Sequence, residues 1–291
     1  YTPEVFGIVH ILGSFIMLFA VFTTMGYHGA LILPKNDNTA LKLLCLCLFS
    51  TIVISVITFI IIIISQEYFT EKLNVPELIN FLWLTPIFVF SHGVYQTLRY
   101  WNTRLVKFDN IAISRIMEIL CKKIYQIPAG IIGYATSSSL IIADLFSTTV
   151  KNIVLFRNVG LLKLGTIIKK TNPSDFLAVA KRYRKFPMFS VGSELIGRMP
   201  AMIVAFMVVK YFGQDILGLY GLSLMVLSIP STLITNSISE AFIPRASMAK
   251  HEGKHVELLE KIYVRMAAIL IFPFMILGLF GDQLFIFVFG S

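Results

Sequence analysis

The chain contains a series of long apolar runs, and these limit its possible folds more than any other feature. Eight apolar windows of about 20 residues, the length that crosses a bilayer as a helix, lie between polar segments. They are Phe6–Gly26, Leu43–Ser65, Ile79–Tyr100, Ile111–Gly133, Ser137–Phe156, Met188–Phe212, Leu217–Ser239 and Ile262–Gly281. The strands of an outer-membrane barrel are only about 10 residues long. Charged residues make up 14% of the 291 residues, against about 25% in soluble domains. The sequence therefore predicts an all-α, polytopic membrane protein with about eight transmembrane helices.

Basic residues are concentrated in alternate loops. The four basic loops, which hold 20 of the 25 Lys and Arg residues, are Tyr27–Lys42, Arg99–Arg115, Lys151–Pro187 and Glu240–Arg265. The loops between them are Gln66–Leu78, Tyr134–Thr136 and Gly213–Ile216, and they contain only Lys72. The positive-inside rule then places the basic loops in the cytoplasm and both ends of the chain outside. An outer N-terminus without a signal peptide predicts a further span upstream.

Two similar segments indicate an internal repeat. Glu4-Val5-Phe6-Gly7 opens a span that closes at Pro34, and Asp215-Ile216-Leu217-Gly218 opens one that closes at Pro244. The offset between the copies is 211 residues at the start and 210 at the end. Because both copies run in the same direction, the pattern predicts two lobes related by an axis along the membrane normal. It also predicts about six spans per lobe, hence twelve or more in a complete protein.

The longest loop divides the two predicted lobes. Asn172-Pro173-Ser174-Asp175 is typical of a helix start, and a short basic amphipathic helix on the inner membrane surface is predicted for Phe176–Lys185. We therefore predict an N-terminal lobe over residues 1–160, a cytoplasmic linker over 161–187 and the start of a C-terminal lobe over 188–291. Because the repeat predicts about six spans per lobe, we expect that some spans of each lobe lie outside this chain.

Charges occur inside the predicted span Ile111–Gly133. Arg115, Glu118, Lys122 and Gln126 are spaced to form one polar stripe on a helix. Charged groups in the middle of a transmembrane helix usually face a bundle interior or a wet cavity, where they mark a transport path. The alternative is that Glu118 and Lys122 form a packing pair one helical turn apart. Lys123 has no acid at the preceding turn, which favours the cavity.

Other spans add three more ionisable residues. Asp144 lies in Ser137–Phe156, and Lys151 shares its helix face. Glu194 and Arg198 are one turn apart just before Pro200, so an isolated structural pair is again the alternative. Phosphate binds Lys as a point charge and Arg bidentately. The residues predicted to bind an anionic head group are Lys122, Lys123, Arg198 and Arg115, and those predicted to tune charge or couple transport are Glu118, Asp144 and Glu194.

The segment His251-Glu252-Gly253-Lys254-His255 matches the H-E-x-x-H zinc motif. Gly253 weakens a helix there, and no third ligand is nearby, so we interpret it as a solvated turn rather than a metal site. No Ser/His/Asp set, Walker A or Rossmann glycine pattern is present. We therefore predict no enzyme activity, no catalytic residue, no metal and no cofactor, and the coupling ion is left open. The net charge of +9 follows from the topology and does not predict nucleic-acid binding.

Several segments together resemble a known family. They are Tyr1–Gly7, Ala30–Lys35, Tyr95–Asn102 leading into Ala112–Arg115, Ala180–Pro187, and Phe242–Ala246 with His251–Gly253. In this order and spacing they resemble bacterial polysaccharide exporters of the O-antigen flippase type, within the multidrug/oligosaccharidyl-lipid/polysaccharide exporter superfamily. The resemblance runs along essentially the whole chain.

The resemblance implies a two-lobed transporter bundle in the bacterial inner membrane. It implies a polyprenyl-diphosphate-linked oligosaccharide as substrate, flipped by alternating access, with membrane lipids and polysaccharide-assembly proteins as partners. A small-molecule drug exporter of the same superfamily is one alternative, although it would need an acidic cation site. A membrane-embedded glycan polymerase or ligase is another, but it would need a larger outer loop than Gln66–Leu78.

Overall fold

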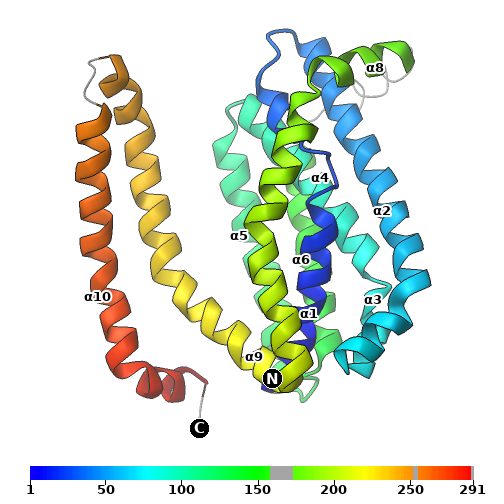
Figure 1. Cartoon of the computed structure of the whole chain (residues 1–291), viewed down its shortest axis with the longest axis vertical. Helices are drawn as coiled ribbons and strands as arrows, with labels where there is room; N and C mark the ends of the chain where they lie inside the picture. The colour runs from blue at the N-terminus through cyan, green and yellow to red at the C-terminus, as the bar shows by residue number, and fades with distance from the viewer. Residues whose placement is uncertain (158–172, 252–254, 290–291) are drawn as a thin grey trace. The chain divides into compact units, whose positions relative to one another are not determined.

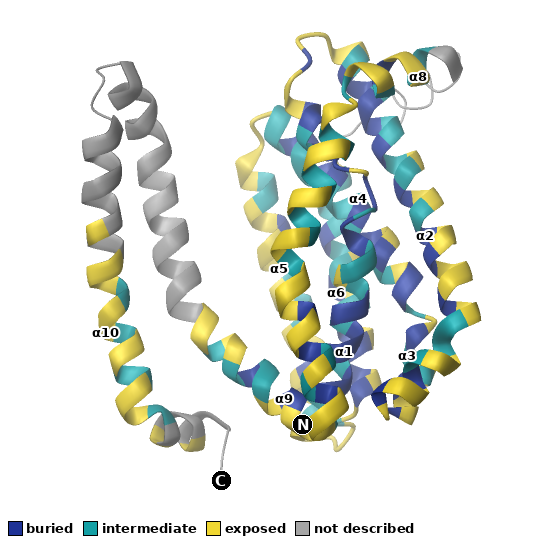
Figure 2. Ribbon diagram, viewed as in Figure 1, coloured by how far each residue is buried: buried dark blue, intermediate teal, exposed yellow. Residues whose placement is uncertain are grey.

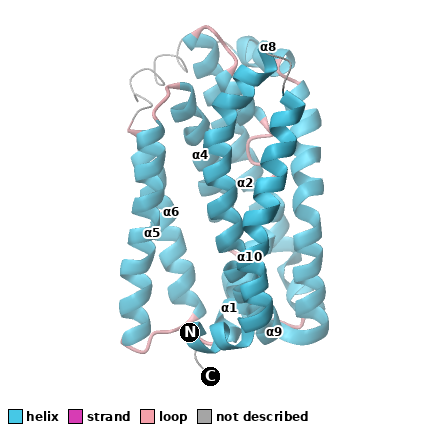
Figure 3. Cartoon of the chain, turned by 90° about the vertical axis from the view of Figure 1, so that its left-hand side faces the viewer, coloured by secondary structure: helices cyan, strands magenta, loops and turns pink. Residues whose placement is uncertain are grey.

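The computed structural model describes residues 1–157, 173–251 and 255–289, and these form only helices and their connections (Figures 1 and 3). The elements are α1 (Pro3–Ala20), η1 (Tyr27–Ile32), α2 (Asp37–Leu73), η2 (Pro76–Leu78), α3 (Ile79–Leu82), α4 (Thr85–Arg104), α5 (Phe108–Ile131), α6 (Ser137–Phe156), α8 (Pro173–Arg182), α9 (Lys185–His251) and α10 (His255–Phe289). The all-α fold predicted from the apolar runs is confirmed. The chain divides into two compact units, residues 1–219 and 220–291.

Within the described residues, four helices are long and apolar enough to cross a membrane: α1, α2, α6 and the Lys185–Ser228 part of α9. The bent pair Pro76–Leu82 and Thr85–Arg104 makes a fifth. Helix α5 has the length of a span but carries the charges singled out above. In α10 the apolar stretch is Ala267–Gly281. The protein is therefore a polytopic helical membrane protein.

Two predicted span boundaries appear as backbone breaks. The predicted outer loop Gly213–Ile216 coincides with Gly213, whose φ of 88° interrupts the helical conformation within α9. Glycine adopts this left-handed region without a steric penalty. The predicted span Ile79–Tyr100 is bent by 49° between α3 and α4, where Pro86 begins the new helix. A helix broken in this way exposes backbone polar groups that must be satisfied inside the protein.

Figure 2 shows many exposed residues along α2 and α5, and a large share of them are bulky apolar side chains. Ile60 and Ile64 on α2 are 51% and 78% exposed, and Ile131 on α5 is 80% exposed. Such a surface is stable against lipid rather than water. Helix α2 continues past the predicted span end at Ser65 to Leu73, so the predicted loop Gln66–Leu78 is largely helical.

Helix α8 packs against one end of the first unit. Its start at Pro173 confirms the predicted helix start, although it ends at Arg182 rather than Lys185. Val179 is buried in a cluster with Leu41, Leu98 and Trp101. Lys42 on α2 forms an ion pair with Asp175 at 3.2 Å. The predicted lobe boundaries remain predictions, because they concern the complete repeat.

Candidate functional site

Helices α5 and α6 pack against each other and are joined by two ion pairs. Glu118 Oε1 lies 2.5 Å from Lys151 Nζ, and Lys122 pairs with Asp144. Both pairs therefore cross between helices. The predicted packing pair of Glu118 with Lys122 is not among the ion pairs of the described residues, because each group finds its partner on α6 instead.

Lys151 is the most enclosed cation of this region. Lys151 as a whole is only 8% exposed, and its Nζ lies 4.1 Å from the ring centre of Tyr95 on α4. The aromatic face and the Glu118 carboxylate together compensate the loss of water around the ammonium group. Lys151 was also predicted to begin the basic cytoplasmic loop Lys151–Pro187. The structure corrects this, because Lys151 is a buried residue of α6, whose bounds match the predicted span Ser137–Phe156.

The polar stripe of α5 is rotated slightly from the predicted one. Ser114 and Gln126 are buried, and Glu118 and Lys122 are half-buried. Arg115 and Lys123, by contrast, are exposed. Lys123 donates a hydrogen bond of 3.2 Å to Gln126 Oε1. Among the described residues, neither Arg115 nor Lys123 has a carboxylate at ion-pair distance, so their positive charges are not neutralised within this part of the chain.

A second charged cluster joins η1 to α9. Arg198 Nη2 lies 3.5 Å from Glu194 Oε2, as the one-turn spacing predicted. The other oxygen, Glu194 Oε1, lies 3.7 Å from His28 Nε2. On its other side, His28 Nδ1 is hydrogen-bonded to Thr24 Oγ1 at 2.6 Å. The pair is thus not isolated: Glu194 is shared between a guanidinium on its own helix and an imidazole on η1.

Helix α4 contributes a polar face that the sequence analysis missed. His92, Gln96 and Arg99 are spaced at i, i+4 and i+7, which places them on one face. His92 Nδ1 and Gln96 Oε1 are buried and have no hydrogen-bond partner among the described residues. Asn152 on α6 donates to both oxygens of Ser91, the neighbour of His92, at 3.0 Å. The spacing of these three residues in the sequence is the signal that could have revealed this face.

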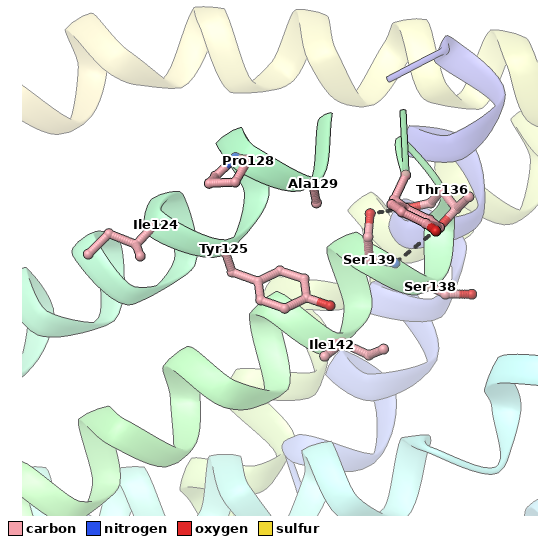
Figure 4. Close-up of a pocket in the computed structure, with 9 residues that line it drawn as sticks. Ile124, Tyr125, Pro128, Ala129, Thr136, Ser138, Ser139 and Ile142 are labelled. Carbon is pink, nitrogen blue, oxygen red and sulfur yellow. Dashed lines mark hydrogen bonds between the residues drawn. The ribbon is translucent and has the colours of Figure 1, made fainter. Parts of the chain in front are cut away.

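The unit also has a pocket of about 430 Å³ where α5 leads into α6. Figure 4 shows Tyr125 and Ile142 at this pocket, with Ser139 hydrogen-bonded within the Thr136 turn. Ser139 also donates to the Tyr1 hydroxyl at 3.3 Å, and that hydroxyl donates to the Gln126 carbonyl at 3.0 Å. The lining residues do not include any of the predicted charged site residues, so this pocket is separate from the ion pairs described above.

The structure thus arranges the seven predicted site residues in three settings. Lys122, Glu118 and Asp144 take part in ion pairs between α5 and α6; Glu194 and Arg198 form the cluster with His28; Arg115 and Lys123 lie on the exposed surface of α5. The structure brings in Lys151 and His28 as direct partners of predicted residues. Side chains of the H-E-x-x-H segment lie outside the described residues, and the described residues contain no group of three or more metal-ligating side chains.

Comparison with known proteins agrees with this membrane architecture. The chain is 21% identical over 254 residues to the teichuronic acid biosynthesis protein TuaB of Bacillus subtilis (strain 168). That match covers 87% of this chain and 50% of the relative, so the chain spans about half the length of the curated relative that it matches. No solved structure matches the chain. The family described as polysaccharide biosynthesis protein matches residues 1–291, which is the whole chain, and the chain therefore belongs to this family.

Proposed function

We propose that the complete protein carries a polyprenyl-diphosphate-linked oligosaccharide across the bacterial inner membrane by alternating access. Membership of the polysaccharide biosynthesis family and the likeness to a teichuronic acid biosynthesis protein support a role in polysaccharide export. The physical task is to move a diphosphate and its sugars past hydrocarbon, where unpaired charge is costly. Cations that lack a carboxylate of their own lower that cost, while the lipid tail stays in the bilayer.

The observation that carries the proposal is the charge balance of the side chains assigned above to the two charged clusters and to the exposed surface of α5. The cations are Arg115, Lys122, Lys123, Lys151 and Arg198, and the acids are Glu118, Asp144 and Glu194. Lys122 and Lys151 already have a carboxylate each. Arg198 has only Glu194, which it shares with His28, and Lys123 has no acid among the described residues. Arg198 and Lys123 are therefore the best candidates to receive a diphosphate.

Arg198 is also well placed to change partners. Its carboxylate partner belongs to α9, in the predicted C-terminal lobe, and the same carboxylate contacts His28 in the predicted N-terminal lobe. In the proposed cycle, separation of the lobes breaks the Glu194–His28 contact and uncovers the neighbouring Arg198 guanidinium. The donors of this guanidinium that Glu194 does not occupy then bind phosphate oxygens, and their planar arrangement suits bidentate binding. The pairs of α5 and α6 join helices of one lobe and stay intact.

The test is a flipping assay with the complete protein in liposomes. The probe is a polyprenyl-diphosphate disaccharide with a fluorescent label, and a membrane-impermeant quencher measures how fast the label crosses. We expect Arg198→Gln to reduce the initial rate at least tenfold, because the head group loses its bidentate partner.

The matched control is Lys210→Gln. Lys210 is a cation of the same helix, but it lies at 5.5 Å from the ring centre of the exposed Tyr211 and outside the charged cluster. It should leave the rate within twofold of wild type. Equal rates for Arg198→Gln and Lys210→Gln would remove Arg198 from the site. Transport of a cationic dye in place of the lipid probe would favour a drug exporter instead.

A further inference from the structure

The two segments of the predicted internal repeat are in contact. Glu4 at the start of α1 accepts a hydrogen bond of 2.5 Å from the side-chain amide of Gln214, which directly follows the break at Gly213. Gly7 and Gly218, the glycines that align in the two copies, lie at the centre of this contact. All of these residues belong to the first compact unit. Segments that are similar in sequence and 211 residues apart thus meet face to face.

The contact is reciprocal. A side-chain carbon added to Gly7 would overlap the backbone carbonyl of Gln214, four residues before Gly218. One added to Gly218 would overlap the backbone carbonyl of Pro3, four residues before Gly7, and would lie 3.0 Å from the backbone nitrogen of Gly7. Each copy therefore touches the same position of the other. Such self-complementary pairing is the mark of a two-fold axis that passes through the contact.

We propose that this reciprocal glycine contact is the closure between the two lobes at the outer end of the transporter, and that it must open and close in each transport cycle. The opening and closing in each cycle rest on the proposed function. The symmetry of the contact is independent of that function. An axis through the contact leaves the two helix starts free to separate symmetrically. The predicted topology places both starts, Glu4–Gly7 and Asp215–Gly218, on the outer side.

Two features suit the contact to reversible closure. Glycine allows the backbones to approach with no side chains between them, so the helices can part without rearranging a packed interior. The side chains of the exposed Glu4 and the half-buried Gln214 are linked by a hydrogen bond, which can exchange with water at little cost. Elsewhere on α1, Phe15 meets Phe206, which lies in α9 before the break at Gly213, edge to face at 5.3 Å, so this neighbouring contact is apolar.

A reversible cross-link tests the proposal. The double variant Glu4→Cys/Gln214→Cys in the complete protein should be joined efficiently by a short thiol-specific reagent that a reductant cleaves. The single variants serve as controls for Cys45, Cys47 and Cys121, which lie in α2 and α5. In the liposome assay above, cross-linking should reduce flipping of the lipid probe at least tenfold, and the reductant should restore it. Flipping at the uncross-linked rate by fully joined protein would show that the contact is static and would overturn the proposal.

A second readout needs no substrate. Adding Gly218→Ala to the cysteine pair should lower the cross-linking yield at least threefold, because the methyl group holds the segments apart. Gly197→Ala on the same helix is the matched control, since a side-chain carbon there has no neighbour within 4 Å. Equal yields in both backgrounds would overturn the proposed closure. If the cross-linking results hold but no variant, including wild type, flips the lipid probe, the closure stands and the proposed substrate is wrong.

Discussion

Replacing Lys151 with Met should lower the free energy of unfolding by about 3 kcal/mol, near the lower end of the cost of removing one partner from a buried ion pair. The change leaves Glu118 on α5 without its 2.5 Å partner, in a helix pair that also packs against α4. The Glu118 side chain keeps 28% exposure, which is why the lower end applies. The contact of the ammonium group with the Tyr95 ring is lost as well. Thermal unfolding in detergent, followed by tryptophan fluorescence, measures the loss.

Two further variants separate the ion pair from general damage. Glu118→Gln/Lys151→Met removes both charges and should recover most of the stability, because no carboxylate is left unpaired. Lys123→Met also removes a lysine in the α5–α6 region, but one that is exposed and hydrogen-bonded only to Gln126 within the described residues. It should change stability by less than about 0.5 kcal/mol, as surface substitutions usually do. A double variant that is no more stable than Lys151→Met would contradict the pairing.

Much of the fold could be predicted from local patterns. The span Ser137–Phe156 coincides with α6 in both of its bounds, because Thr136 caps its start and the apolar run is uninterrupted. Within the predicted loop Gly213–Ile216 the structure has a break at Gly213, while the following three residues are helical. The end of α2 was not predictable in the same way. Helical structure continues to Leu73 through polar residues, and hydropathy reports where a helix leaves the membrane rather than where it ends.

The sequence could predict which residues belong to the candidate site, but not which of them form ion pairs with each other. Helical spacing correctly put Glu118 and Lys122 on an inward face of α5. Spacing also suggested that they pair with each other, whereas their partners are 33 and 22 residues away on α6. Periodicity defines the face of one helix and contains no information on which residues of another helix meet it. Lys151 was missed for a related reason: it lies near a span end, where a count of loop charges cannot tell a buried lysine from a cytoplasmic one.

Close packing of helices at Gly93 leads to the second large effect. A side-chain carbon at Gly93 on α4 would lie 2.5 Å from two side-chain atoms of Thr51 on α2 and 2.8 Å from Cβ of Thr23. Thr51 is fully buried, and its hydroxyl is bonded to the Cys47 carbonyl at 2.9 Å, so it cannot turn away freely. We expect Gly93→Ala to cost about 1–3 kcal/mol of stability, as overpacking of a tight interior does. The same thermal unfolding measurement detects this loss as a lower midpoint.

The cause of that loss can be isolated by making room on the facing helix. Gly93→Ala/Thr51→Ala removes the two Thr51 atoms nearest to the new methyl group and leaves only Cβ of Thr23 among the three close atoms, so the double variant should be more stable than Gly93→Ala alone. Gly13→Ala in α1 is the matched control, because a side-chain carbon there has no neighbour within 4 Å. Alanine also favours a helix over glycine by about 0.5–1 kcal/mol, so the control should be neutral or slightly stabilising. If Gly93→Ala behaved like Gly13→Ala, α4 could not lie as close to α2 as the glycine contact requires, and the arrangement that holds His92, Gln96 and Arg99 on one face of the bundle would need revision.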